Sequence, residues 1–494
     1  MQRGALVRVA AATSLCAPLL ASAQSSGGLS VVPSLSISQS VTDNINLSQD
    51  KRAEAITSVS PGVRVSSRSG RLQGTLDYSL NANYYARDGE RSGFTNALAA
   101  GFTSELVPNI ASIDAKASVS QQAISAFGVQ GVDPNLGRSN RTEVRVLSLT
   151  PVVRGRLTDT ITAQASSTWT RSTSSGAVGA ESTALAHAAQ IGGQAGRFGW
   201  SADVADVTSS YGAGGRKTGN RRFGLGLSYT PNSDLQVNVH AGRETETVRD
   251  VESQSTNNYG FGATWSPSPR TTATARYDRR YFGNGYALQL SHRMVRGLIT
   301  LSDSRDANNG AVSDRTLAFV QRYDEVFRQL VAAGLPANVA DQLTRLVLQN
   351  ENLFIGRAVA LQRRQDVALV LQGVRSTVAL TVFRSSSIRL DQASTATDDL
   401  SLADGLSQRG YSLTGSYTVS STTSLALAYS DSRNGGERAT VPGVRNDLRS
   451  FTASLTGRLT QRVNYSLSAR HTTFDSALSP YTENGAQLTL SFAF

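Results

Sequence analysis

The sequence predicts an all-β fold, a transmembrane antiparallel β-barrel of about 22 strands with a range of roughly 18 to 26. Three observations favour this fold class. Apolar and polar residues alternate along many segments, the last of these segments ends on an aromatic residue, and residues 1–23 have the pattern of a secretory signal peptide. Alternation is typical of a strand between two different environments, because successive side chains point to opposite faces.

The segment 486–494 shows the alternation most clearly. Its apolar face comprises Ala486, Leu488, Leu490, Phe492 and Phe494, whereas the opposite face carries mainly amide and hydroxyl side chains. A strand of this kind that ends on an aromatic residue resembles the assembly signal of bacterial outer-membrane β-barrels. We therefore expect a barrel-assembly machinery to recognise Leu488, Leu490, Phe492 and Phe494.

The N-terminus predicts export. Arg3 and Arg8 precede an apolar run from Val9 to Leu20, and Ala21-Ser22-Ala23 provides the small residues of a cleavage site. The run is shorter than the roughly 20 apolar residues of a membrane-spanning helix. We interpret residues 1–23 as a signal peptide cleaved after Ala23, and 24–494 as an outer-membrane barrel domain. Cleavage also removes the single cysteine, Cys16, and with it any thiol or disulfide chemistry.

The composition excludes a bundle of membrane-spanning helices. Only 39% of the residues are hydrophobic, and no stretch beyond the signal peptide is continuously apolar. A closed sheet suits so polar a chain, because it satisfies every backbone group in lipid while only half of each strand faces the lipid.

The connections alternate in length, which predicts the orientation. Short connections, expected to be periplasmic turns, occur at 231–234, 267–270, 295–296 and 420–421; longer polar ones, expected to face outside, occur at 41–56, 122–141, 388–406 and 433–446. Both ends of the mature chain would then lie in the periplasm. Tyr229 and Trp265, each two residues before a turn proline, fit either a periplasmic aromatic girdle or ordinary strand-end aromatics.

Residues 311–354 interrupt the strand pattern. Phe319, Tyr323, Phe327 and Leu330 follow helical spacing, and a second helical pattern begins after Pro336. We expect a helical hairpin insert in the eighth outer loop. Because a barrel near 22 strands is wide enough to be plugged, this insert would either act as a plug or lid of the lumen or pack on itself above the barrel.

Several short motifs, in this order and spacing, resemble a known family. They include Thr42-Asp43-Asn44-Ile45-Asn46-Leu47, Ser60-Pro61-Gly62, Glu105-Leu106-Val107-Pro108, Leu149-Thr150-Pro151 and Gly373-Val374-Arg375. Together they resemble the outer-membrane β-barrel proteins associated with the PEP-CTERM/exosortase system, found beside exopolysaccharide loci in Gram-negative bacteria. The resemblance implies an outer-membrane location and a link to surface polysaccharide or biofilm matrix, and it supplies no catalytic residue.

The residues that could support catalysis are scattered. The four histidines, His187, His240, His292 and His471, occur without metal-ligand spacing, so we expect no metal, no cofactor and no enzyme. A barrel lipase would need a serine–histidine pair at the lipid boundary. His292 and His471 could lie near that boundary, but no flanking motif supports such a pair.

Charge is the remaining functional feature. The chain carries a formal net charge of +11, and 45 of its 48 basic residues are arginines. The lumen face is expected to carry Arg276, Arg280, Arg293, Arg458, Arg462 and Arg470, together with Asp77, Asp114 and Asp278. Such arginines would either attract anions, because the guanidinium group pairs with carboxylates and phosphates, or brace the barrel against acidic residues or meet lipopolysaccharide phosphates at the rim. A nucleic-acid partner is excluded by export.

These observations lead to a non-enzymatic outer-membrane channel or assembly component for exopolysaccharide export, with lipopolysaccharide, the barrel-assembly machinery and an anionic polysaccharide as expected partners. The alternatives are a structural surface protein that anchors matrix through its outer loops, and a general porin.

Overall fold

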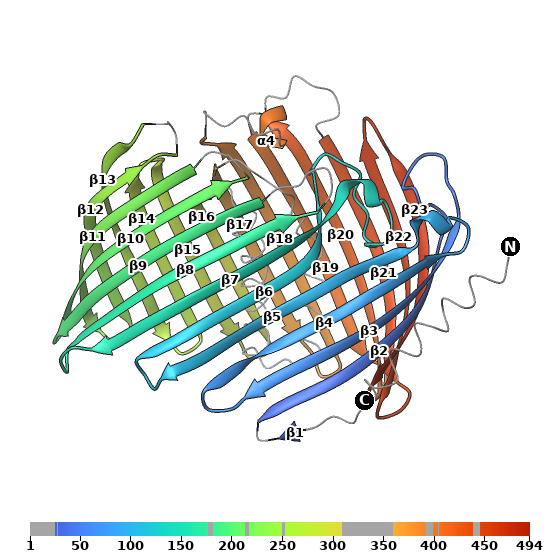
Figure 1. Ribbon diagram of the computed structural model, residues 1–494, viewed down its shortest axis with the longest axis horizontal. Helices are drawn as coiled ribbons and strands as arrows, with labels where there is room; N and C mark the ends of the chain where they lie inside the picture. Colours follow the sequence, from blue (N-terminus) through green and yellow to red (C-terminus); the bar gives the residue numbers. More distant parts are fainter. Residues whose placement is uncertain are drawn as a thin grey trace.

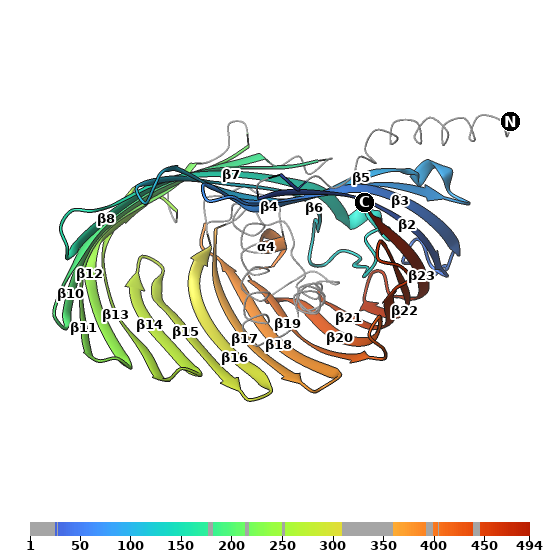
Figure 2. The ribbon, with the colours of Figure 1, turned by 90° about the horizontal axis from the view of Figure 1, so that it is seen from below.

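The computed structural model describes residues 25–26, 28–175, 181–212, 217–248, 252–308, 359–391, 399–403, 405–437 and 445–494. Within these residues one antiparallel sheet closes on itself, because β2 (Leu29–Thr42) pairs with β23 (Tyr481–Ala493) as well as with β3 (Glu54–Arg68). β2 to β23 form a ring of 22 strands, shown in Figures 1 and 2. The predicted antiparallel barrel of about 22 strands is therefore confirmed.

The strands follow one another around the ring in chain order. A two-residue strand, β1 (Ser25–Ser26), pairs with the start of β2. The others are β4 (Leu72–Tyr85), β5 (Gly93–Val107), β6 (Ala111–Ala123), β7 (Arg141–Arg156), β8 (Ile161–Ser174), β9 (Glu181–Ala195), β10 (Phe198–Tyr211), β11 (Lys217–Asn232), β12 (Leu235–Glu246), β13 (Gln254–Ser268), β14 (Thr271–Arg280), β15 (Gly283–Met294), β16 (Gly297–Asn308), β17 (Ala360–Gln372), β18 (Ser376–Arg389), β19 (Gly405–Thr418), β20 (Thr423–Glu437), β21 (Arg445–Arg458) and β22 (Val463–Ser476).

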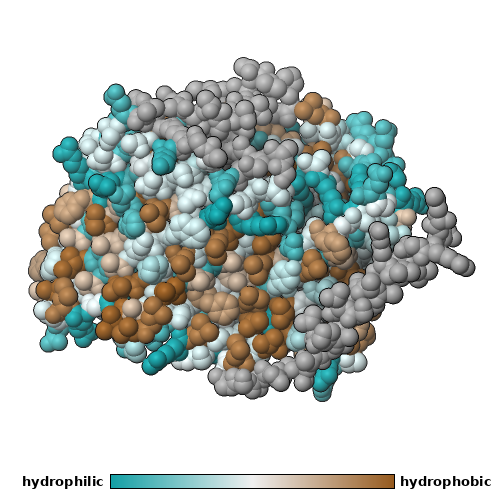
Figure 3. Space-filling view, viewed as in Figure 1, coloured by the Kyte–Doolittle hydropathy of each residue, from teal (hydrophilic) through white to brown (hydrophobic). Residues whose placement is uncertain are grey.

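The alternation in the sequence separates a lipid face from a lumen face. On β11, Phe223, Leu225 and Leu227 point outward and are 48%, 55% and 64% exposed in the absence of a membrane. Hydrophobic side chains gather over the middle and lower wall in Figure 3, and hydrophilic ones lie toward the outer loops. Buried residues lie on the other face, inside the ring, which is the arrangement that a membrane barrel requires.

Short and long connections occupy opposite ends of the barrel. The turns at 233–234, 269–270 and 295–296 lie at the end that we assign to the periplasm, and the loops at 43–53 and 124–140 lie at the other. Two strands continue further than expected: β11 runs through Pro231 and β13 through Pro267. The register shifts at both places, so the prolines lie where the ladder needs no amide donor.

Helices are few in the described part of the chain. They are one turn of α-helix, α4 (Asp399–Leu402), and two 3₁₀ segments, Gly89–Arg91 and Arg138–Asn140. The helical hairpin predicted for 311–354 lies outside the described residues, so this part of the prediction is not confirmed. Among the residues described, no helix has the length and apolar character needed to span a membrane.

Candidate functional site

The third outer loop, residues 124–140, folds into the barrel and is called the inner loop here. It connects β6 to β7, and its chain enters the ring in Figure 2. Asp133 of this loop lies 2.9 Å from Arg470 on β22, and the Asn135 carbonyl accepts a 2.9 Å hydrogen bond from the Tyr85 hydroxyl. The Tyr481 hydroxyl donates to the carbonyl of Gln130. Three contacts from β22, β23 and β4 thus hold the loop against the wall.

An apolar cluster anchors the same part of the inner loop. Leu136, which is 1% exposed, packs with Ile45, Leu47, Ile56, Tyr85, Phe474 and Tyr481. These side chains come from the first outer loop and from β3, β4, β22 and β23. Burial of apolar surface at the outer end of the lumen therefore stabilises the folded loop.

The start of the inner loop crosses to a distant part of the wall. The Ala126 carbonyl accepts a 2.7 Å hydrogen bond from Asn446 Nδ2 on β21, and six strands (β22, β23, β2, β3, β4 and β5) separate β21 from β6. The Asp399 carboxylate at α4 accepts hydrogen bonds from Ser125 Oγ at 2.5 Å and from Ala126 N at 2.6 Å. The inner loop thus spans part of the lumen and restricts it.

The local sequence explains the shape of the inner loop. Asn140 donates to the carbonyls of Ser125 and Val129 and accepts from the Ser125 amide, so one side chain closes the loop at its base. Gly137 has φ +57°, a left-handed conformation in which a Cβ would meet Leu47 at 2.6 Å. A glycine is needed there because the backbone turns against the apolar cluster.

Charged side chains inside the wall form ion pairs. Asp278 on β14 lies 2.8 Å from Arg276 and 3.0 Å from His240 on β12. Arg280 Nη2 lies 2.6 Å from Glu244 Oε1, and Glu244 is fully buried. Asp306 lies 3.1 Å from the other terminal nitrogen of Arg280. These arginines therefore brace the wall and present little unbalanced positive charge to the pore.

The turn after β14 covers this ion-pair network. The Tyr281 amide donates to Glu244, and the Arg280 guanidinium lies over the Phe282 ring at 5.1 Å. Burial raises the pKa of the Tyr281 phenol well above its ordinary value, so the hydroxyl stays protonated. These aromatic residues pack beside the buried part of the network, Arg280 and Glu244.

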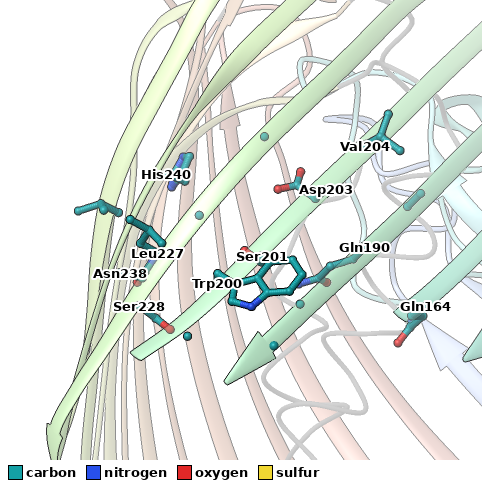
Figure 4. Close-up of a pocket in the computed structure, with 18 of the residues that line it drawn as sticks. Gln164, Gln190, Trp200, Ser201, Asp203, Val204, Leu227, Ser228, Asn238 and His240 are labelled. Carbon is teal, nitrogen blue, oxygen red and sulfur yellow. The ribbon is translucent and has the colours of Figure 1, made fainter. Parts of the chain in front are cut away.

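A cavity of about 950 Å³ lies against β8 to β14. Figure 4 shows Gln164, Gln190 and Asp203, which come from the adjacent strands β8, β9 and β10. Amide, hydroxyl and small side chains make up most of the lumen-facing lining, and Asp203 lies 3.6 Å from Arg222. Amides and hydroxyls offer both donors and acceptors, so this surface suits polar uncharged groups.

Unpaired positive charge is concentrated at the periplasmic end. The ten short turns, with the three strand residues on each side, contain eleven arginines and three acidic residues. We call the eleven the periplasmic arginine rim: Arg68, Arg71, Arg154, Arg156, Arg197, Arg270, Arg293, Arg296, Arg375, Arg458 and Arg462. All are exposed, and none is in an ion pair with a residue that the structure describes. By register, Arg68, Arg154, Arg156, Arg293 and Arg458 point into the lumen.

The residues predicted to charge the lumen fall into three groups. Arg276, Arg280, Arg470 and Asp278 lie in the lumen but are paired, as described above. Asp77 pairs with Arg64 across β3 and β4, and Asp114 accepts a hydrogen bond from Thr103. Arg293, Arg458 and Arg462 belong to the periplasmic arginine rim. Arg462 lies in the turn between β21 and β22 rather than on a strand, because β21 ends four residues earlier.

Sequence reasoning missed the acidic partners of these arginines. Glu244 and Glu246 lie on the polar face of β12 with His240, at the alternate positions that point inward. That spacing was visible in the sequence. Glu483 lies on the next strand of the same hairpin as Arg470, whereas Asp133 could not be paired with Arg470 in advance, because it comes from a distant segment that only the closed barrel brings close.

The two boundary histidines have hydroxyl and amide neighbours. His292 Nδ1 lies 2.8 Å from Thr271 Oγ1, and His471 Nδ1 lies 2.7 Å from Asn484 Oδ1. Neither contact is the serine–histidine pair that a lipase would need. In the described ranges, no three histidine, cysteine or acidic side chains are grouped so that they could hold a metal ion.

The closed ring and its outward apolar band have the fold of an outer-membrane β-barrel protein. No family model matches the sequence, and no curated protein matches it. Among solved structures, the FrpB iron transporter from Neisseria meningitidis (F5-1 variant) is similar, with a TM-score of 0.51 and 10% identity over 94% of this chain and 83% of that chain. The open form of the ferric-catecholate import receptor Fiu from E. coli K12 gives a TM-score of 0.50 and 8% identity over 96% and 82%. At such identities the likeness concerns the fold.

Proposed function

We propose that this barrel is a non-enzymatic outer-membrane channel whose periplasmic entrance attracts anions. The observation that carries the proposal is the periplasmic arginine rim, in which eleven exposed arginines face only three acidic residues. A ring of charged side chains of one sign, set in a low-dielectric wall, raises the local concentration of oppositely charged solutes. Five of the arginines point into the lumen, so the attraction acts on solutes that enter the pore.

We further propose that the substrate class is an acidic exopolysaccharide on its way out of the cell. Guanidinium groups pair with carboxylates in a two-bond geometry, which suits an acidic sugar polymer. Beyond the rim, the cavity wall offers the amides and hydroxyls of Gln164, Gln190 and Asn238, which match sugar hydroxyls. The resemblance to barrels found beside exopolysaccharide loci supports the same substrate class.

The inner loop gives this channel a defined restriction at its outer end. Because the loop is held by an ion pair, an apolar cluster and hydrogen bonds to β21, it narrows the lumen at its outer end. A polymer would be attracted at the basic end and would leave past the inner loop.

The first test is the reversal potential of the purified mature protein in a planar bilayer with a KCl gradient. We expect anion selectivity, which a variant with Arg68, Arg154, Arg156, Arg293 and Arg458 changed to Gln should lose. A matched control changes Arg145, Arg171 and Arg221, which point outward and pair with acids. A cation-selective wild type would contradict the anion channel. A barrel that does not conduct would favour a structural surface protein.

The second test concerns the substrate. An acidic oligosaccharide such as an oligogalacturonate should reduce the current at lower concentration than a neutral dextran of equal length, and only while the rim is intact. If both sugars reduced the current equally, the protein would be a general porin and not a channel for acidic polysaccharide. In a deletion strain, normal polysaccharide export with lost matrix adhesion would overturn the export role.

A further inference from the structure

Three arginines lie side by side on the lipid-facing side of the wall. Arg384 on β18 is directly opposite Arg409 on β19, and Arg409 is directly opposite Arg433 on β20. They share a face with Leu413 and Val382, which are 47% and 45% exposed on the outside of the barrel. We call these three residues the arginine ladder.

The protein itself leaves part of this charge unbalanced. Arg433 lies 3.2 Å from Asp431 and 3.8 Å from Asp447, but Asp431 also neutralises Arg449 at 3.3 Å. Arg384 and Arg409 are exposed, and neither is in an ion pair with a described residue. Like charges directly opposite each other on adjacent strands destabilise a sheet. An external anion would remove this cost.

The depth of the arginine ladder in the membrane follows from the residues below it. On β19 the outward side chains continue from Arg409 to Tyr411 and Leu413, and on β20 they continue from Arg433 through Asp431 to Tyr429 and Leu427 toward the periplasm. The rings of Tyr411 and Tyr429 lie 5.9 Å apart and mark the aromatic belt at the outer interface. Arg409 lies about 7 Å beyond Tyr411 along β19, since two residues of a strand rise by that amount, and Arg433 lies farther beyond Tyr429, with Asp431 between them.

At this level the barrel meets the headgroups of the outer leaflet. We propose that Arg384, Arg409 and Arg433 form a binding site for the phosphate groups of lipopolysaccharide. Adjacent strands are about 4.8 Å apart, so two neighbouring guanidinium groups can bind one phosphate from both sides. The acyl chains of the same molecule would lie along Val382, Leu413 and Leu427, which are exposed on the same face closer to the periplasm.

Two other outward arginines near the outer end are already paired with an acidic residue. Arg221 on β11 lies 2.6 Å from Asp206 of the adjacent strand, and Arg171 lies 2.8 Å from Glu181. In each of these pairs a carboxylate of the protein already neutralises the guanidinium group, which is then not available to a phosphate. Arg221 is therefore a matched control: it has the same residue type, the same outward face and a similar height, but its charge is balanced.

The test measures binding of purified bis-phosphorylated lipid A to the detergent-solubilised full-length mature barrel, by native mass spectrometry and by a titration. We expect the R384Q/R409Q variant to bind about tenfold more weakly than wild type or more so, and R221Q to bind like wild type. Enzymatically dephosphorylated lipid A should bind wild type as weakly as bis-phosphorylated lipid A binds the variant. The slower electrophoretic migration after boiling shows that each variant is folded.

Two results would overturn the site. One is equal lipid A binding by R384Q/R409Q and wild type; the other is equal binding of the phosphorylated and dephosphorylated forms. Competition by inorganic phosphate or by phosphatidylglycerol vesicles as strong as that by lipid A would replace lipopolysaccharide with a general phosphate ligand. The reversal potential of R384Q/R409Q should stay at the wild-type value, so this site and the channel can fail independently.

Discussion

Arg470 on β22 lies 2.9 Å from Asp133 of the inner loop and 3.1 Å from Glu483 on β23, and all three side chains are at most 9% exposed. One buried guanidinium group therefore joins a loop in the lumen to the place where the barrel closes. Removing a buried ion's partner is costly, because the remaining charge is left without compensation.

The first prediction concerns this contact. R470Q leaves two buried carboxylates without their cation, so we expect a loss of about 3 to 5 kcal/mol in the free energy of unfolding and a larger single-channel conductance as the inner loop detaches. Urea titration followed by electrophoresis without boiling measures the stability. R64Q is the control, since Arg64 pairs with an exposed Asp77, and it should cost less than about 1 kcal/mol. Equal losses for both variants would show that the inner loop is not anchored here.

The second prediction concerns the apolar anchor. Leu136 is 1% exposed, so L136A should destabilise the protein by about 2 to 4 kcal/mol and make the inner loop cleavable by added protease. L225A changes a lipid-facing leucine and should leave protease resistance unchanged. A protease-resistant L136A barrel would mean that the hydrogen bonds at Ala126 and Asn135 suffice to hold the loop.

The third prediction is a pH dependence at the outer rim. Burial alone would raise the pKa of Asp43, but hydrogen bonds from Lys51 and Asn484 outweigh it and hold the pKa below its ordinary value of 3.8. A carboxyl group whose pKa is lowered on folding stabilises the protein above its unfolded pKa, and this stabilisation is lost as the pH falls through the folded pKa.

We therefore expect wild type to be more stable than D43N at pH 7 and the difference to shrink below about pH 4. Unfolding titrations of both proteins between pH 7 and pH 2.5 measure the difference. A gap that is constant across this range would show that Asp43 acts through packing and not through its charge. The effect should be modest, because the Asp43 side chain is 34% exposed.

The fourth prediction concerns assembly. F492S/F494S removes one aromatic residue from the lipid-facing side of β23 and the aromatic residue that follows the strand, and it should strongly reduce the amount of folded barrel in outer-membrane fractions of expressing cells. A493S changes the lumen-facing neighbour between them and should assemble normally. Efficient assembly of F492S/F494S would place the recognition signal elsewhere in the chain.

The sequence predicted the strands and their faces well because side chains of a membrane strand alternate between the lipid and the lumen. Leu225 and Leu227 could be assigned to lipid from their alternation alone, and the same rule placed Arg276, Asp278 and Arg280 on the lumen face. The prolines predicted the strand ends less well, because Pro231 and Pro267 lie within β11 and β13, at the places where the register shifts.

The sequence by itself determined the barrel and its approximate size, because strand alternation and connection length are local properties of the chain. Only the tertiary structure decided which arginines are neutralised by an acidic residue and which remain available to bind an external anion. Arg470 meets Asp133 across more than three hundred residues, whereas Arg384 and Arg409 lie together because β18 and β19 pair in one register. Ion pairing depends on distance in space, and closure of the sheet sets that distance.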